Sequence, residues 1–435
     1  MANKKEIEAA KRAIKHHPKA VIITIVAIIL IIAIAFCVLY FGFPKTWDSL
    51  MSSFRGEDDP NNGLGGDGGS GAGGSGPSGG LQLGEDELKI HFINVGQGDC
   101  IYIQFPDGTD MIIDCGNKST GYDYADTQKY LNDVNPDGKI NHLMLTHCDE
   151  DHVDNLDEII YDFEIENIYM PNVLAVPKNS KGESVVALQE KIDDLDRDLV
   201  ARFDDKDVIT TQTYANFFIA ALSEENCTIH LTVDPDENTN SIVIEESTYR
   251  LTFYCPTQEY YNQTGFSNGK YDGTSYKEAE YKNAISPIGI LEYNGRRVVL
   301  TGDSNQINEP IFVRRINGSL DCDVLKVGHH GSETSSLNPF LDAITCEYAV
   351  ISCNMVGNTY SHPRQAALDR LAAHNMTVYR TDKNGTVVLT IDGDGEMTFS
   401  VETEVSQEVI LIGADTEKAQ ASSLFAMPLL AGLCL

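Results

Sequence analysis

Three apolar runs of β-strand character each lead directly into histidine or aspartate, and this recurrence constrains the fold more than any other feature. The junctions are His142–Leu145 before His147–His152, Val298–Leu300 before Asp303, and Val324–Val327 before His329 and His330. A helix-capping acidic loop, a turn aspartate or a packed histidine would each explain one junction alone. Together they predict strands that deliver side chains to one edge of a sheet, where imidazoles and carboxylates suit zinc, manganese or iron.

The remaining patterns predict an α/β fold. Further apolar or alternating runs have β-strand character, namely Leu88–Asn94, Ile101–Phe105, Met111–Ile113 and Ile288–Tyr293. Helical spacing occurs near Ser184–Phe203 and Pro363–His374. Lys383 lies in a polar segment with a glycine, which predicts a hairpin turn.

The composition excludes several classes of protein. The 435 residues contain 65 Asp and Glu against 32 Lys and Arg, and 42% of them are hydrophobic. A formal net charge of −33 argues against a basic nucleic-acid coat protein, and the apolar content is too high for a generally disordered chain. Ten cysteines in a chain of this length are too few for a disulfide scaffold.

The N-terminal region has the pattern of a membrane anchor and a tether. A basic tail, residues 1–19, precedes residues 20–43, which carry no charge and would form a helix of roughly 36 Å, enough to span a bilayer. A cleaved signal peptide is the alternative, but its apolar region is only about 7–15 residues long. Residues 44–85, rich in Gly, Ser and Asp, predict a flexible linker. We expect one globular domain over 86–404 and leave the tail 405–435 unassigned.

The charges around the predicted span indicate its orientation. Six Lys or Arg residues precede residue 20, whereas only Lys45 and Arg55 lie between the span and the Gly-rich part of the linker. Positive charge beside a span is retained on the cytoplasmic side. We therefore expect a single-pass protein of the cell membrane with a cytoplasmic N-terminus and an extracellular catalytic domain.

The ordered motifs over residues 88–395 resemble the metallo-β-lactamase superfamily, in the branch similar to the hydrolase domain of ComEC-type competence proteins. The resemblance rests on Phe92–Asp99, Ile112–Gly116, His147–His152, Asn283–Ser286, Leu300–Asp303, His329–Ser332, Tyr360–Pro363 and Arg380–Gly385. It implies an αββα sandwich with two divalent metal ions, zinc or manganese, at the sheet edge.

The resemblance also implies how the ligands are divided between the two metals. His147 and Asp149 would face the first metal, Asp151 and His152 the second, and Asp303 both, while His329 or His330 would complete the second. Relative to the usual pattern of the superfamily, Asp149 replaces a histidine, and no histidine lies near Asn283–Ser286. The first metal is therefore expected to bind more weakly, or to be manganese, because oxygen ligands suit harder ions.

Other residues are predicted to support these ligands. Asp114 would orient a ligating histidine and Asp99 would point at the site, although a plain turn explains Asp114 equally well. The resemblance places Asn283 and Ser286 beside them. Asp151 is a predicted catalytic residue that orients the attacking hydroxide. His362 is predicted to stabilise a phosphoryl oxygen or to protonate the leaving group, with capping of the following helix as the alternative.

These features predict a membrane-anchored, metal-dependent hydrolase, a phosphodiesterase or nuclease that uses a metal-activated hydroxide. DNA or nucleotides are the expected substrates. Beyond residue 43, however, 63 Asp and Glu stand against 26 Lys and Arg, which opposes the binding of a polyanion and leaves room for smaller phosphodiesters. The alternatives are a degenerate, non-catalytic cell-surface binding module on the same fold and a lactam or thioester hydrolase. The oligomeric state is not predicted.

Overall fold

The computed structural model describes residues 86–116, 122–203, 208–264, 278–354 and 360–417. The predicted basic tail, membrane span and linker, which together are residues 1–85, lie outside these ranges. Within the described ranges, no helix is both long enough and apolar enough to cross a membrane.

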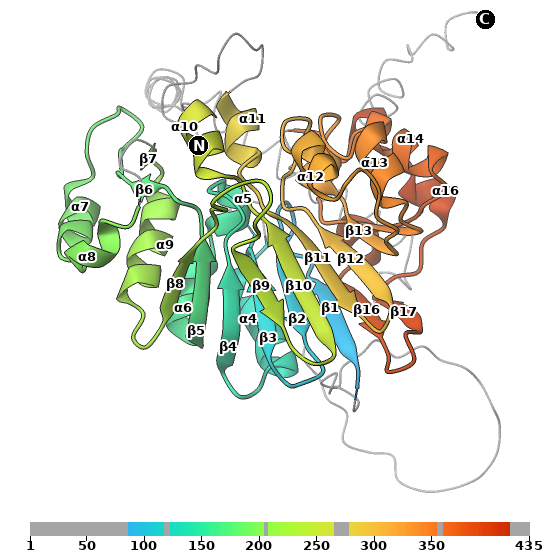
Figure 1. Cartoon of the computed structure of the whole chain (residues 1–435), viewed down its shortest axis with the longest axis horizontal. Helices are drawn as coiled ribbons and strands as arrows, with labels where there is room; N and C mark the ends of the chain where they lie inside the picture. Colours follow the sequence, from blue (N-terminus) through green and yellow to red (C-terminus); the bar gives the residue numbers. More distant parts are fainter. Residues whose placement is uncertain (1–85, 117–121, 204–207, 265–277, 355–359, 418–435) are drawn as a thin grey trace, which may run out of the picture. The chain divides into compact units, whose positions relative to one another are not determined.

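Two large mixed sheets face each other (Figure 1). The first has eight strands in the order β17 (Met397–Val401), β16 (Val387–Ile391), β1 (Leu88–Phe92), β2 (Ile101–Gln104), β3 (Asp110–Ile113), β4 (Lys139–Met144), β5 (Glu164–Met170) and β8 (Thr228–Leu231). The second has seven in the order β15 (Thr377–Arg380), β14 (Tyr348–Ile351), β13 (Val324–Lys326), β12 (Arg296–Leu300), β11 (Ile288–Tyr293), β10 (Tyr249–Tyr254) and β9 (Ile242–Glu245). Each sheet has one parallel group of four strands, β3, β4, β5 and β8 in the first and β12, β13, β14 and β15 in the second.

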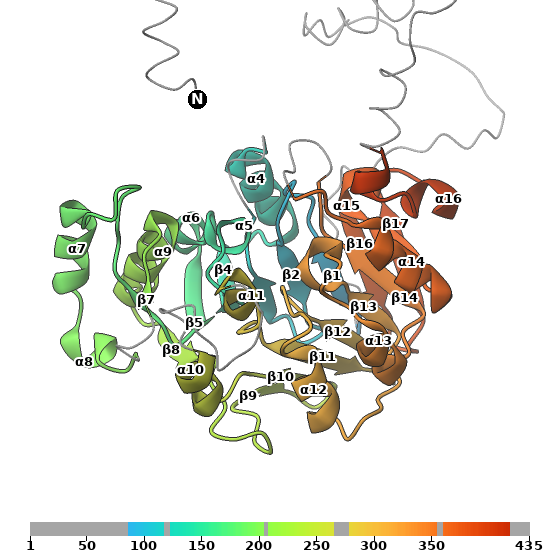
Figure 2. The ribbon, with the colours of Figure 1, turned by 90° about the horizontal axis from the view of Figure 1, so that it is seen from above.

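Helices cover the outer faces of both sheets (Figure 2). On the first sheet they include α4 (Tyr124–Val134), α6 (Leu156–Asp162) and α9 (Gln212–Ser223), and on the second α12 (Glu309–Arg315), α13 (Asn338–Ile344) and α14 (Gln365–Ala373). The other elements are α5 (Glu150–Val153), α7 (Val186–Asp193), α8 (Arg197–Val200), α10 (Gln258–Thr264), α11 (Glu278–Asn283), α15 (Thr381–Asn384), α16 (Gln407–Ile410), and the small sheet of β6 (Leu174–Ala175) and β7 (Val208–Ile209).

Three apolar cores separate these layers, because successive side chains of a strand point to opposite faces of its sheet. In β1, Ile90 and Phe92 join the core between the two sheets. His91, between them, lies on the opposite face, where its Nδ1 is 2.7 Å from the Tyr130 hydroxyl of α4. The predicted α/β fold is confirmed, and its layers follow the order helix, sheet, sheet, helix.

Apart from the bounds of some strands, the predicted elements differ from the observed ones at two places. The helical pattern of Ser184–Phe203 forms two helices, α7 and α8, because the Asp196 side chain accepts from the backbone N–H groups of Asp198 and Leu199 and begins a new helix there. The hairpin predicted at Lys383 is wrong. That residue lies in the helical turn α15, which connects β15 of one sheet to β16 of the other, so the two strands do not pair.

The described part of the C-terminal segment packs against the predicted domain. The Arg380 guanidinium, fully buried, donates to the carbonyl oxygens of Ile410 (2.7 Å) and Ile412 (2.8 Å). The Gln407 side chain exchanges two hydrogen bonds with the backbone of Val378 in β15. Residues 405–417, which had no assignment, therefore continue the globular unit.

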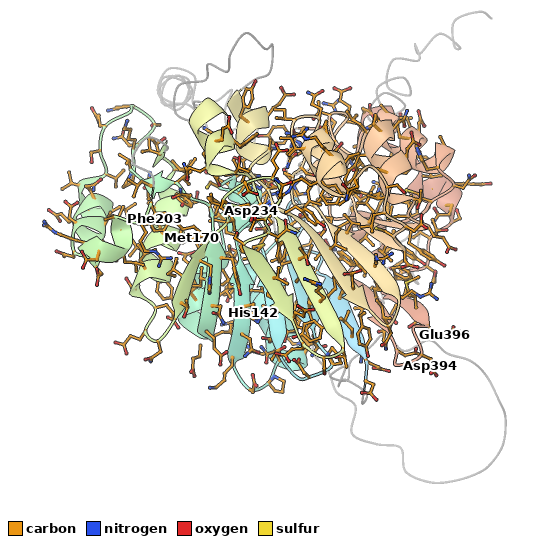
Figure 3. The ribbon with its side chains drawn as sticks, in the orientation of Figure 1. His142, Met170, Phe203, Asp234, Asp394 and Glu396 are labelled. Atoms are coloured by element: carbon orange, nitrogen blue, oxygen red, sulfur yellow. The ribbon has the colours of Figure 1, made fainter. Side chains whose placement is uncertain are left out.

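The functional residues gather where the parallel strands of both sheets end. The residues that follow β4 come from the first sheet, whereas those that follow β12 and β13 come from the second, so the expectation of one edge of a single sheet is wrong. A strand pattern does not reveal which partners the strand will pair with. Asp394 and Glu396, in the turn between β16 and β17, lie at the opposite end of the sheets (Figure 3).

Candidate metal centre

Asp303, which follows β12, lies at the centre of a cluster of four imidazoles. Its Oδ2 is 3.7 Å from His147 Nε2 and 3.6 Å from His329 Nε2. Its Oδ1 is 3.2 Å from His152 Nε2 and 3.5 Å from His330 Nε2. The cluster thus has two sides. We call His147, Asp149 and His329 the first half, and Asp151, His152 and His330 the second half.

Three of these imidazoles are held in the same tautomer by the groups behind them. His152 Nδ1 donates to Asp114 Oδ2 (2.7 Å), and His330 Nδ1 donates to the Ser352 carbonyl (2.9 Å). The Thr146 hydroxyl donates to Asp114 Oδ2 (2.7 Å), so it accepts from His147 Nδ1 at 3.1 Å. In neutral imidazoles, each Nε2 therefore presents a lone pair towards Asp303.

Asp114 connects the two halves through these bonds. It follows β3, is fully buried, and accepts from the Thr146 backbone N–H at 2.8 Å in addition to its bonds with the Thr146 hydroxyl and His152. Its backbone φ of +57° lies in the left-handed region, which is uncommon for a residue with a side chain. Such strain persists where surrounding structure fixes it, often at functional sites.

The turn after β13 separates two consecutive histidines. Gly328–Gly331 is a short 3₁₀ turn in which His329 and His330 have φ values of +49° and +52°. The left-handed conformation sends the two rings apart, to 6.2 Å between centroids and 71° between planes. His329 consequently joins the first half and His330 the second, where its Nε2 is 3.2 Å from Asp151 Oδ2.

Two glycines allow the backbone segments around the cluster to approach closely. A Cβ at Gly98 would collide with the Asp151 carbonyl of α5. At Gly302, φ is +49° and a Cβ would lie 2.9 Å from the Thr146 hydroxyl and 3.1 Å from Ser286 Cβ. Any larger residue at either position would push apart the segments that carry the ligands.

The first half is more open than the second, although each half contains two imidazoles. The Asp149 side chain is 41% exposed, and its Oδ2 lies 3.8 Å from His147 Nε2. The amide of Asn283, in the orientation that satisfies both of its ends, donates to Asp149 Oδ2 (3.1 Å) and accepts from His329 Nε2 (3.2 Å). Ser286 Oγ is 3.3 Å from His147 Nδ1 and accepts from the Asp303 backbone N–H at 3.2 Å.

The ionisation of the cluster reflects its buried charges. Burial raises the pKa of Asp303, but the charges of His152, His329 and His330 outweigh that effect and hold the pKa well below its usual range. Burial lowers the pKa of His152, but Asp303 and Asp114 outweigh it and raise the pKa well above the ordinary value. His147 has a pKa well below its ordinary value because burial dominates.

Two further predicted residues lie behind and beside the cluster. The Lys326 ammonium, fully buried in β13, pairs with Asp99 Oδ2 at 2.6 Å, and Asp99 Oδ1 is 3.5 Å from His330 Nδ1. The His362 ring meets His329 edge-on, with 5.1 Å between centroids. Burial, with the charges of His329 and His330, lowers the pKa of His362 to about 3.

The structure thus brings all of the predicted site residues into one region. These are His147, Asp149, Asp151, His152, Asp303, His329, His330, Asp99, Asp114, Asn283, Ser286 and His362. Sequence reasoning missed Thr146, Lys326 and the Ser352 carbonyl. A lysine inside an apolar run that ends in histidine was a usable signal for Lys326. Ser352 gave none, because a backbone carbonyl makes the same bond with any side chain.

The donor atoms fit divalent cations. His147 Nε2 is buried and has no hydrogen-bond partner, and Asp303 Oδ1 faces the Nε2 atoms of His152 and His330. His152 Nε2 and His330 Nε2 are 3.2 Å apart, and both Nδ1 atoms are occupied as donors. Two facing lone pairs repel unless a cation or a proton lies between them. Nitrogen and carboxylate donors in this arrangement are a usual ligand set for zinc, manganese or iron.

Residues 93–216 match the metallo-β-lactamase superfamily. Over 103 residues the chain is 41% identical to the competence protein ComA of Neisseria gonorrhoeae. This aligned stretch covers 24% of this chain and 15% of that protein. Over 106 residues it is 39% identical to the ComE operon protein 3 of Bacillus subtilis, covering 24% of this chain and 13% of that protein. The chain thus spans only a small part of the length of these relatives.

Among solved structures, the metallo-β-lactamase fold protein YhfI from Bacillus subtilis superimposes with a TM-score of 0.37 and 12% identity, covering 72% of this chain and 100% of that one. The sequence match carries the assignment. The chain contains a metallo-β-lactamase domain, and the predicted resemblance to competence proteins over the hydrolase region is confirmed.

Proposed function

We propose that this chain is a two-metal hydrolase of phosphodiester bonds, and that the two ions are zinc or manganese. One observation carries the proposal, namely that His147, His152 and His330 all present Nε2 towards the two oxygens of Asp303. His147, Asp149 and His329 would hold one ion, and Asp151, His152 and His330 the other, with Asp303 between them. Bound divalent ions polarise a phosphoryl oxygen and lower the pKa of water.

The residues of the chain would position the reactants around these ions. Asp151, whose side chain is 22% exposed, would orient the attacking water. His362 would contact the phosphoryl oxygen or the leaving group from beside His329. Lys282 supplies positive charge near Asp149, and Arg364 supplies it near His362. This local charge favours an anionic substrate on an otherwise acidic protein.

The test of the chemistry uses the full chain purified in a mild detergent. We expect close to two equivalents of zinc or manganese per chain and metal-dependent cleavage of an oligonucleotide or another phosphodiester. Substoichiometric metal and no turnover would favour the alternative of a degenerate, non-catalytic binding module on the same fold. Turnover of a lactam or thioester in preference to any diester would favour the alternative of a lactam or thioester hydrolase.

We further propose that residues 20–43 anchor the chain in the cell membrane with the catalytic domain outside. The charge count around the predicted span supports this orientation. The eight described cysteines are free and seven of them are buried, which limits their oxidation in an extracellular setting. Protease added to intact cells should release the domain, and a domain that resists until the cells are lysed would reverse the orientation.

A further inference from the structure

One exposed aromatic side chain stands next to the candidate metal centre. Tyr360 is 65% exposed, and its ring stacks on His362 with 6.0 Å between centroids and 29° between planes. His362 in turn meets His329 edge-on, and His329 Nε2 is 3.6 Å from Asp303 Oδ2. The three rings therefore form a continuous series from the surface to the cluster.

The segment that carries Tyr360 is attached to the histidine turn. The Arg364 backbone N–H donates to the Gly331 carbonyl at 2.9 Å. A Cβ at Gly331 would lie 2.6 Å from Pro363 Cβ, so only glycine permits this approach. Ser361, directly after the tyrosine, has a φ of +62°, a conformation that persists where the surrounding structure fixes it. Pro363 and Arg364, shortly after Tyr360, are therefore held against the turn that carries His329 and His330.

Exposure alone would mean little, since single exposed apolar side chains are common. Among the described residues, Tyr161 is exposed to a similar extent, 68%, near the end of α6. The difference is that the ring of Tyr360 stacks on a histidine of the site. Its ring is therefore linked to the cluster through His362 and His329.

The net charge of the protein indicates which part of a substrate Tyr360 would contact. Beyond residue 43 the excess of Asp and Glu over Lys and Arg weakens recognition through a phosphate backbone, which depends on positive charge. Stacking of a base on an aromatic ring does not depend on the net charge of the protein. It requires a base whose face is exposed, as in an unpaired strand, whereas a base in a duplex is stacked between its neighbours.

We propose that Tyr360 is the specificity-determining residue on which an unpaired nucleobase of the substrate stacks while the adjoining phosphodiester lies at the cluster. This inference rests on the proposed phosphodiester hydrolysis. It assigns the substrate as a single-stranded or mononucleotide diester and predicts that a base-paired strand is a poorer substrate.

The experiment compares a single-stranded oligonucleotide with an abasic strand of the same length, both cleaved by the full chain with added zinc or manganese. Tyr360→Ala should raise KM for the base-bearing strand by about five- to 150-fold and leave the abasic strand unchanged. Tyr360→Phe should retain the preference, because the ring is kept. Tyr161→Ala is the matched control, an exposed tyrosine outside the ring series, and should behave as the parent.

A binding arm keeps the inference testable without turnover. Fluorescence anisotropy of the two labelled strands, measured with metal chelated, should show base-dependent binding that Tyr360→Ala abolishes. A mononucleotide diester as competitor distinguishes a nucleotide substrate from a strand. A parent that cleaves both strands equally, or a Tyr360→Ala protein that keeps the preference, would overturn the inference while leaving diester hydrolysis intact. Absence of any cleavage with base-dependent binding preserved would instead contradict the proposed function alone.

Discussion

The two halves of the metal cluster share Asp303 but differ in how their other members are held. In the second half, His152 and His330 are buried, and each donates from Nδ1, to Asp114 Oδ2 or to the Ser352 carbonyl. In the first half, the side chain of Asp149 is 41% exposed and that of His329 is 24% exposed. The amide of Asn283 stands between these two side chains.

This difference indicates that the second half is more fully preorganised than the first, in which only His147 is both buried and bonded through its Nδ1. A ligand whose second nitrogen is already bonded loses little freedom when it binds an ion, and its tautomer is already correct. Exposed side chains must be ordered first, and water competes for their oxygens. We therefore expect the two halves to bind metal with unequal affinity, and the following experiments measure how unequal they are.

The largest effect should come from the residue that the halves share. Asp303→Asn keeps the size of the side chain but removes the charge that faces all four imidazoles. Turnover of a diester should fall by several orders of magnitude, and metal content should fall in both halves. Kinetics and metal analysis on the same sample check this, with thermal unfolding as the control for folding. Parental turnover would contradict the assignment of Asp303 to the centre of the site.

A substitution behind the second half should have a smaller effect. Asp114→Asn removes the negative charge behind His152 and replaces one acceptor oxygen with an NH2 donor, so the side chain can no longer accept from both His152 and Thr146. Affinity for the more tightly held ion should therefore fall about 10- to 100-fold. The metal affinity of the first half should fall less, because Asp114 contacts that half only indirectly, through the Thr146 hydroxyl that is bonded to His147. The matched control is Asp110→Asn, a buried carboxylate bonded to the Tyr102 hydroxyl at 2.6 Å. Equal loss of metal affinity in both variants would mean that the effect is general destabilisation.

Removal of metal from the parent protein should proceed in two steps. Titration with a chelator should release one ion at a concentration at least about tenfold below that needed for the other. The first ion lost should be the one in the half with exposed Asp149. Metal analysis after each addition measures the steps. A single transition that removes both ions together would contradict the unequal halves.

The smallest effect should come from repairing the first half. Asn283→His would place an imidazole where the amide now lies, 3.2 Å from His329 Nε2. Because nitrogen ligands suit zinc, the gap between the two chelator midpoints should narrow, by up to about tenfold. Asn283→Ala is the matched variant and should leave the gap as wide or wider. No difference between the two variants would exclude position 283 from the first half.

Part of this organisation could be predicted from the sequence. The strand predicted at Ile288–Tyr293 has the same bounds as β11, because a largely apolar run, interrupted only by the half-buried Glu292, is buried on both faces of a covered sheet. The histidines and aspartates could be identified because they follow such strands directly. The pairing of strands could not be predicted in the same way, since β4 and β12 have similar patterns and belong to different sheets.

Local sequence by itself determined which chemical groups reach the site. His147, His152, Asp303 and His330 follow the ends of apolar strands, and they supply imidazoles and a carboxylate there whichever strands pair in the folded protein. This could be read from the sequence because strand periodicity and side-chain chemistry are local properties. The tertiary structure alone decided which atoms meet. The left-handed turn sends His329 and His330 to opposite halves. The tautomers of His152 and His330 depend on acceptors at Asp114 and Ser352, which lie far from them in the sequence, so only the folded chain brings each pair together.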